Sequence, residues 1–168
     1  MTTETTIAPV HKVLSVRCAV EDAFVTFTDR IGDWWPLPTH SMGGARSESI
    51  RFEAGAQGRL VERLANGSET VWGYVLDWDP PNRLRISWHP GKDCTRTQVH
   101  EATEVEVTFS PEDGGTRVEL VHRGWERLGE RAPEARESYH GGWDPVLELY
   151  REAASAAGDQ GQAGSISR

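Results

Sequence analysis

Aromatic side chains at alternate positions are the residues best suited to hold a small molecule. In residues 70–78, Trp72, Tyr74 and Trp78 share with Leu76 the period of two that places side chains on one face of a β-strand. The chain has seven Trp but only four Phe and three Tyr. An indole combines a large apolar face with one N–H donor, which a ligand or water in a cavity could satisfy. Ordinary core packing is the alternative explanation.

Two ionisable residues could add acid–base chemistry to such a surface. His122 continues the alternation of Leu120, and Glu62 shares a face with Leu60 and Leu64. An inward histidine or carboxylate could exchange protons with a bound molecule. His122 could also be a core histidine paired with a backbone or acidic group. No catalytic residue is therefore assigned, and His122 and Glu62 are the candidates; their spacing does not show whether they converge.

No pattern in the chain is typical of a metal or cofactor site. The six histidines include no HExxH motif and no close Cys/His pair with zinc spacing. Cys94 and His100 share a polar loop and are the one pair that could hold a structural or regulatory metal ion. Neither a nucleophile elbow nor a phosphate-binding glycine loop is present. We therefore expect neither metal nor cofactor.

Charge and composition limit the partners. Lys and Arg number 18 against 26 Asp and Glu, a net charge of −8, and no basic cluster occurs. Nucleic acids and anionic membranes are therefore not expected as partners. The N-terminus lacks the basic start and apolar core of a signal peptide. We expect a cytoplasmic protein in which Cys18 and Cys94 are reduced thiols.

The chain divides into short strands framed by two helical segments. A helix begins at Val20, carries Phe24, Phe27 and Ile31 on its apolar stripe and is expected to end at Gly32. Seven strands are expected, at 10–18, 48–53, 59–64, 70–78, 84–88, 104–109 and 117–122. A long C-terminal helix follows. This order predicts an α+β fold with an antiparallel sheet. One domain is expected at 9–157, with a flexible arm at 1–8 and a flexible tail at 158–168.

Residues 73–88 carry a family resemblance. They read G-Y-V-L-D-W-D-P-P-N-R-L-R-I-S-W, similar to the pattern G-x-V-x-x-x-D-P-P-x-R-L-x-x-x-W of activator of Hsp90 ATPase homologue-like proteins in the START-like (SRPBCC) superfamily. Residues 23–35, 115–120 and 142–147 resemble further family segments in the same order. The resemblance implies a helix-grip fold, in which a curved antiparallel sheet of six or seven strands wraps round the C-terminal helix and short helices close one end.

A cavity between sheet and helix is the site that this fold implies. The C-terminal helix offers Trp143, Leu147 and Tyr150 on one face. Trp35 comes from a pair of Trp after the first helix that resembles the family's own. The complete set of expected cavity residues is Trp35, Trp72, Tyr74, Trp78, Trp88, Val107, Phe109, Leu120, His122, Trp143, Leu147 and Tyr150. Residues 36–44, with two Pro and two Gly, are either a mobile lid at the mouth or an ordinary connector.

Three functions fit these features. The first is a protein that binds a hydrophobic or aromatic small molecule in the cavity, without a cofactor. The second is an enzyme that uses the same cavity, a cyclase/aromatase or a hydrolase. The third is an interaction module with an Hsp90-type chaperone as partner, which predicts an exposed apolar patch. A homodimer through a sheet edge or loop is an open alternative to a monomer.

Overall fold

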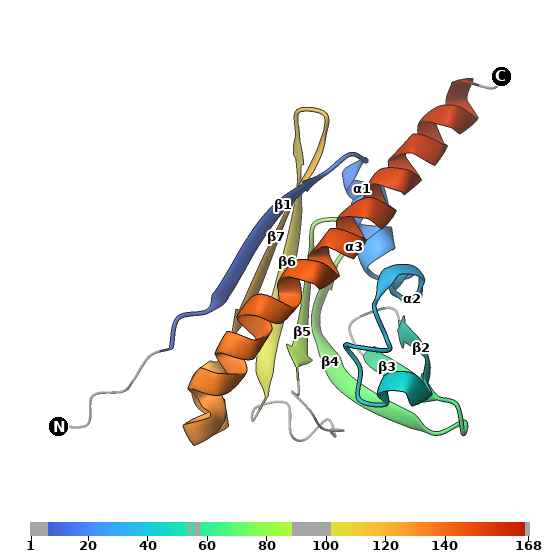
Figure 1. The fold of residues 1–168 in the computed structure, drawn as a ribbon. Coiled ribbons are helices and arrows are strands. Elements are labelled where there is room, and N and C mark those ends of the chain that lie inside the picture. The colour runs from blue at the N-terminus through green and yellow to red at the C-terminus, as the bar shows by residue number, and fades with distance from the viewer. Residues whose placement is uncertain (1–6, 54, 56–57, 89–101, 167–168) are drawn as a thin grey trace.

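A seven-stranded antiparallel sheet in the order β1-β7-β6-β5-β4-β3-β2 forms the frame of the molecule (Figure 1). The computed structural model describes residues 7–53, 55, 58–88 and 102–166. The strands are β1 (Val10–Val16), β2 (Ser47–Phe52), β3 (Arg59–Leu64), β4 (Glu69–Asp79), β5 (Arg83–Trp88), β6 (Thr103–Glu112) and β7 (Gly115–Arg123). The helices are α1 (Val20–Phe27), α2 (Ile31–Trp34), η1 (Gly44–Arg46), η3 (Trp125–Arg131) and α3 (Ala132–Ile166).

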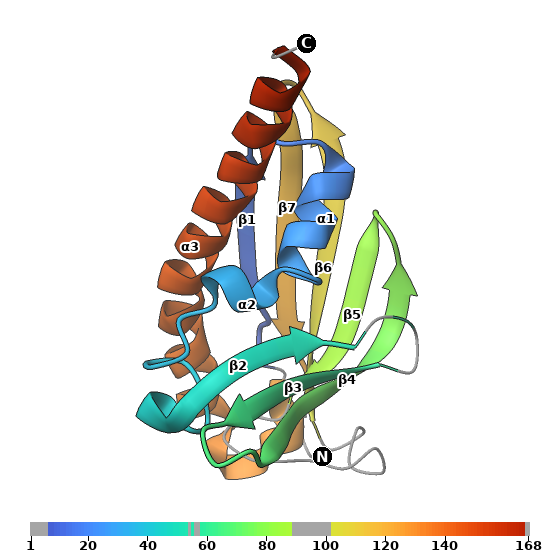
Figure 2. The same cartoon turned by 90° about the vertical axis from the view of Figure 1, so that its right-hand side faces the viewer.

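The long helix α3 runs across one face of the sheet (Figure 1). Figure 2 shows β2, β3 and β4 curling away from the plane of β1, β7 and β6 toward the side that α1 and α2 occupy. Most buried apolar side chains belong to one cluster between this inner face and the helices. The α+β helix-grip fold expected from the sequence is confirmed, with seven strands in the curved sheet.

The helices differ from the sequence expectation at two places. The first helical segment is two helices, because Thr28 leaves helical geometry at φ −97° and ψ −81°. Ile31 starts α2, and Gly32 lies inside α2 rather than ending the helix. Helix α3 continues to Ile166, through most of the segment expected to be a tail. Gly158 lies inside this helix and does not end it. A Cβ at this position would lie 2.0 Å from the carbonyl oxygen of Arg17. Glycine therefore allows the helix to pass close to the backbone of Arg17.

Strand β4 breaks the simple alternation on which the expected cavity face depended. Its register with β3 shifts between the partners of Leu60 and Val61. Its register with β5 shifts between Val75 and Asp77. Val75 therefore joins the inner core, whereas Tyr74 pairs with Arg59 on the outer face. The expectation that Tyr74 faces the cavity is wrong, since each bulge adds a residue to the strand and exchanges its two faces.

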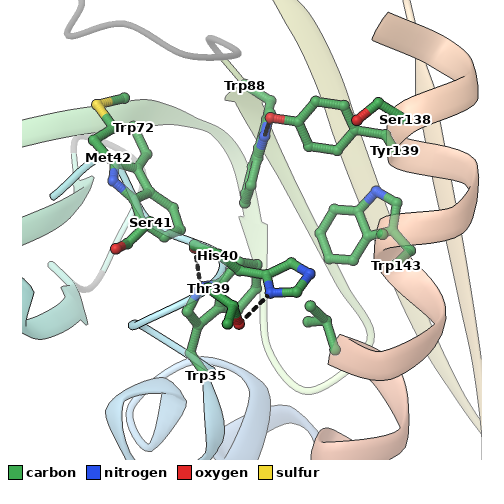
Figure 3. A pocket seen from close by; sticks show the side chains of 12 residues that line it. Trp35, Thr39, His40, Ser41, Met42, Trp72, Trp88, Ser138, Tyr139 and Trp143 are labelled. Atoms are coloured by element: carbon green, nitrogen blue, oxygen red, sulfur yellow. Dashed lines mark hydrogen bonds between the residues drawn. The ribbon is translucent and has the colours of Figure 1, made fainter. Parts of the chain in front are cut away.

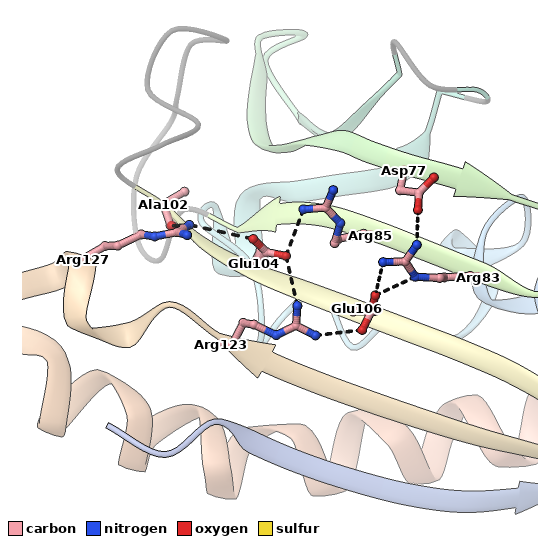
Figure 4. Close-up of polar contacts among 8 residues, drawn as sticks. All are labelled: Asp77, Arg83, Arg85, Ala102, Glu104, Glu106, Arg123 and Arg127. Atoms are coloured by element: carbon pink, nitrogen blue, oxygen red, sulfur yellow. Dashed lines mark hydrogen bonds and ion pairs between the residues drawn. The ribbon is translucent and has the colours of Figure 1, made fainter. Parts of the chain in front are cut away.

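The outer face of β4 to β7 carries a network of charged side chains (Figure 4). Glu106 accepts hydrogen bonds from Arg83 at 2.6 Å and from Arg123 at 2.7 Å. Glu104 accepts one from Arg85 at 3.1 Å. Burial raises the pKa of Glu106, but its two arginine partners outweigh burial and lower the pKa overall. The network explains the charged residues that alternate with apolar ones along these strands.

Candidate functional site

A pocket of about 520 Å³ opens at one end of the grip, between α3, the inner face of β4 and β5, and the segment that follows α2 (Figure 3). Four indoles dominate its wall. Trp72 and Trp88 come from the sheet, Trp143 from α3 and Trp35 from the end of α2. The complete lining is Trp35, Thr39, His40, Ser41, Met42, Trp72, Trp88, Ser138, Tyr139, Gly142, Trp143 and Val146.

The four indoles pack against one another as a continuous aromatic wall. The ring centre of Trp35 lies 5.3 Å from that of Trp72, 6.0 Å from that of Trp88 and 5.9 Å from that of Trp143. Trp88 lies 5.4 Å from Trp143. All of these pairs are tilted or edge-on, the arrangement that aromatic quadrupoles favour. The wall therefore presents both ring faces and ring edges.

Each of these indole N–H groups already has a partner within the protein. Trp35 donates to the carbonyl oxygen of His40 at 2.7 Å, and Trp88 donates to the hydroxyl of Tyr139 at 3.2 Å. Trp72 and Trp143 donate to the side chains of Glu62 and His122. The expectation that the indole N–H groups await a ligand or water does not hold at these four positions. What they offer a ligand is apolar and π surface.

His122 lies behind the pocket wall and is fully buried. Its Nδ1 accepts the indole N–H of Trp143 at 3.1 Å, and its Nε2 lies 2.8 Å from Oγ1 of Thr103. Because that hydroxyl donates to the carbonyl oxygen of Trp88 at 2.7 Å, Nε2 carries the proton and donates to Thr103. Burial lowers the pKa of His122 to about 3. The ring is therefore neutral, with both nitrogens engaged.

Glu62 also lies behind the wall, fully buried on β3. Its carboxylate accepts the indole N–H of Trp72 at 2.8 Å and the backbone N–H groups of Met42 and Gly43 at 2.9 Å each. These bonds tie β4 to the segment that borders the pocket. The two candidate acid–base residues thus do not meet: neither lines the pocket, and each holds a different indole in place.

The other expected cavity residues lie outside the pocket, several of them at the opposite end of the grip. Trp78 and Phe109 pack edge-on against Phe24 at 5.2 and 5.4 Å between ring centres. Tyr150 donates to the carbonyl oxygen of Ala23 at 2.8 Å. Val107 and Leu120 are core residues, and Leu147 borders a separate groove between β1 and α3. None of these six lines the pocket, because α1 and α2 fill that end with aromatic rings.

Sequence reasoning missed several lining residues. Thr39, His40, Ser41 and Met42 lie in the segment that was expected to be a lid or a connector, but none was assigned to the site. Tyr139 was missed on α3. It precedes Trp143 by four residues, so one more turn of the same helical face would have found it.

The described residues hold neither a cluster of metal-ligating side chains nor a membrane-spanning helix. Within them no group of three His, Cys, Asp or Glu side chains could hold a metal ion. Cys94 and His100 lie outside the described residues. Cys18 has a free, buried thiol whose pKa burial raises to about 11. None of the described helices combines the length and hydropathy needed to cross a membrane.

Known proteins resemble this chain in sequence and in fold. The sequence model of the Activator of Hsp90 ATPase homolog 1-like protein family matches residues 17–151. An anthrahydroquino-γ-pyrone synthase, Txn09, is 34% identical, with 90% of this chain and 99% of that chain covered and a TM-score of 0.62. The curated proteins gave no match.

Two more distant solved structures show the same fold. CalC, a self-sacrificing resistance protein from Micromonospora echinospora, is 22% identical with a TM-score of 0.63, covering 90% of this chain and 96% of that chain. NE0264 from Nitrosomonas europaea is 15% identical with a TM-score of 0.62, covering 93% of this chain and 97% of that chain. At these identities the likeness concerns the fold alone.

Proposed function

Because the chain belongs to the Activator of Hsp90 ATPase homolog 1-like protein family, we propose that it binds a planar aromatic small molecule in the pocket of Trp35, Trp72, Trp88 and Trp143. The single observation that carries the proposal is an open pocket of about 520 Å³ whose wall includes four indoles with N–H groups that are already bonded. Such a volume falls within the range of small-molecule sites, about 300–1,000 Å³. The ring faces and edges favour a flat aromatic ligand, and the hydroxyl and imidazole side chains of the lining can bind polar groups on its edges.

The relative with 34% identity supports an aromatic ligand of several fused rings. The name of this relative, anthrahydroquino-γ-pyrone synthase, refers to a tricyclic aromatic framework, and nearly the whole of both chains is aligned. We carry over the class of molecule, a hydroxylated polycyclic aromatic, and not its particular reaction. Emodin, a hydroxylated anthraquinone that absorbs visible light, is a suitable probe for this class.

A matched pair of glycines on α3 tests the binding proposal. Gly142 lines the pocket, and a Cβ there would meet no atom within 4 Å; Gly141 is equally open but exposed and outside the lining. In Gly142→Leu the new side chain fills part of the cavity, whereas Gly141→Leu leaves it unchanged. Both substitutions favour the helix by roughly 0.5–1 kcal/mol, so loss of folding does not confuse the comparison.

The readout is quenching of tryptophan fluorescence by emodin. We expect saturable quenching for the unmodified protein and for Gly141→Leu, and at least a tenfold weaker affinity for Gly142→Leu. Equal affinities for the two variants would place the ligand elsewhere. Absence of saturable quenching by the unmodified protein would contradict the ligand class itself.

A cyclase-like enzyme that uses the same pocket is the second candidate. The observation that favours it is the match to a synthase over 99% of that chain at 34% identity. An enzyme of this kind needs a polar group that reaches the ligand. His122 and Glu62 are occupied behind the wall, so the group must come from elsewhere in the lining.

The chaperone alternative has less support. It predicts an exposed apolar patch, and within the described part of the chain the large apolar residues exposed to solvent are Val13 on β1 and Val25 on α1. Their separate elements favour a pocket over a docking face. We retain a cytoplasmic location as a proposal, which the free thiol of Cys18 supports.

A further inference from the structure

Two of the described residues that line the pocket are titratable, His40 and Tyr139. Tyr139 lies on α3, and burial raises the pKa of its hydroxyl, with the bond from Trp88 acting in the opposite direction. The hydroxyl therefore keeps its proton and can donate a hydrogen bond to a ligand oxygen. His40 lies across the pocket, in the segment between α2 and η1 (Figure 3).

The backbone of His40 is held by hydrogen bonds on both sides, which fixes its main chain beside the pocket. Its N–H donates to the carbonyl oxygen of Pro36 at 2.9 Å, and its carbonyl oxygen accepts the indole N–H of Trp35 at 2.7 Å. The side chain projects from this clamp toward Trp143 (Figure 3). The clamp thus links the imidazole to the aromatic wall itself.

Thr39 contacts one of the two ring nitrogens of His40. Its Oγ1 lies 2.8 Å from Nδ1 of His40 and donates its own proton toward the carbonyl oxygen of Pro36, at 3.4 Å. In the tautomer in which this hydroxyl accepts from Nδ1–H, the lone pair of the ring lies on Nε2. No described residue hydrogen-bonds to that Nε2. A base with an available lone pair thus borders the cavity.

We propose that His40 is the proton acceptor of the pocket and takes the proton of an acidic hydroxyl on a bound aromatic ligand. In this step the ligand O–H bond breaks and its electron pair remains on oxygen, while an N–H bond forms at Nε2. The imidazolium keeps its Nδ1–H on Thr39 and stays beside the new oxyanion. An oxyanion is a nucleophile, so the same transfer prepares a ring closure of the kind that a cyclase performs.

The proposal rests on the proposed function and specifies its ligand further. His40 accepts a proton on one side of the pocket and Tyr139 offers an O–H on the other, so a ligand with a hydroxyl on one edge and a carbonyl oxygen on another matches both. Glu62 lies behind the segment near His40, with its carboxylate held by Met42, Gly43 and Trp72. His122 is separated from the ligand by the ring of Trp143.

The test is the ionisation of bound emodin, which its visible absorption reports directly. Each protein is saturated with dye and titrated with base. For the unmodified protein we expect the ionisation midpoint of bound emodin to fall by about one pH unit below that of free emodin, a tenfold change in its ionisation constant. In His40→Gln, which cannot take up the proton, this shift should disappear although dye still binds at saturation.

Two further variants make the test independent of one substitution. Thr39→Val removes the partner of Nδ1 and should reduce the shift, even if His40→Gln fails to fold. Gly141→Leu, which lies outside the pocket, should show the full shift in the ionisation midpoint of bound emodin. A shift that persists in His40→Gln, or bound dye that ionises like free dye in the unmodified protein, would overturn the proposal and leave the binding function intact. If emodin does not bind the unmodified protein, the proposed function fails first.

Discussion

The indole N–H of Trp143 donates to Nδ1 of His122 over 3.1 Å and so joins helix α3 to strand β7 behind the pocket. Trp125 adds a second contact, since its ring centre lies 4.2 Å from that of His122 and its N–H donates to the carbonyl oxygen of His122 at 2.9 Å. A protonated ring could not accept the N–H of Trp143. The pocket wall therefore depends on a neutral histidine.

This dependence predicts a loss of stability in acid. The pKa of His122 is about 3 in the folded protein, against an ordinary value of 6.5. Between these values the unfolded chain binds a proton that the folded one does not, so stability falls as the pH falls below 6.5. From pH 6.5 to pH 5 the loss should be about 2 kcal/mol.

Urea denaturation at several pH values measures the effect. His122→Gln, which does not titrate, should lose less stability than the unmodified protein over this interval. His140→Gln changes an exposed histidine on α3 and should leave the pH dependence as it was. If the stability of His122→Gln falls with pH as steeply as that of the unmodified protein, His122 is not the source of the loss in acid.

Glu62→Gln tests the link between the pocket wall and the segment from α2 to η1. The backbone N–H groups of Met42 and Gly43 bond to different oxygens of the Glu62 carboxylate. Glutamine replaces one of these oxygens with an NH₂ group, which cannot accept, so at least one of the two hydrogen bonds is lost. We expect a loss of about 1–3 kcal/mol and faster proteolysis within residues 36–44. Glu48→Gln, on the exposed side of β2, should change neither measurement; equal behaviour of the two variants would contradict the role given to Glu62.

Gly158→Ala tests the close approach of α3 to the link between β1 and α1. The new Cβ would lie 2.0 Å from the backbone oxygen of Arg17, which cannot move away independently. Overpacking of this kind costs about 1–3 kcal/mol. Gly141→Ala, with open space around it, should instead stabilise the helix by about 0.5–1 kcal/mol. Thermal denaturation should therefore move in opposite directions, and a rise for both would refute the contact.

Trp88→Leu and Trp78→Leu separate the two ends of the grip. Trp88 lines the pocket, whereas Trp78 packs against Phe24 at the filled end. Loss of one aromatic face of the pocket should weaken emodin binding about tenfold, the equivalent of about 1.4 kcal/mol. Trp78→Leu should lower stability and leave the affinity unchanged. If Trp78→Leu weakened emodin binding, the ligand would lie at the filled end of the grip and not in the pocket.

Strand periodicity and helical spacing were enough to predict the sheet, because buried and exposed faces impose those periods directly on the residues. Four of the twelve expected cavity residues, Trp35, Trp72, Trp88 and Trp143, do line the pocket. Tyr74 could not be placed correctly, since a bulge depends on pairing between strands and leaves no mark on the alternation of β4 itself.

The division of the interior into a filled end and a hollow end was equally invisible in the sequence. Both ends are built from inward aromatic residues, and only the positions of α1 and α2 decide which of them are covered. His40 was missed because a residue in an irregular segment has no periodicity to predict its direction. Its role depends on the clamp from Pro36 and Trp35, which exists only in three dimensions.

The filled end has a consequence for how the protein can change. Rings of Phe24, Phe27, Phe109 and Tyr150 interlock there without any part in the pocket. The filled end thus supports the fold without bordering the pocket, so substitutions at Thr39 or Ser138 can change the pocket lining while these interlocked rings stay in place. Such a scaffold lends itself to acquiring new ligands, in nature or by selection in the laboratory.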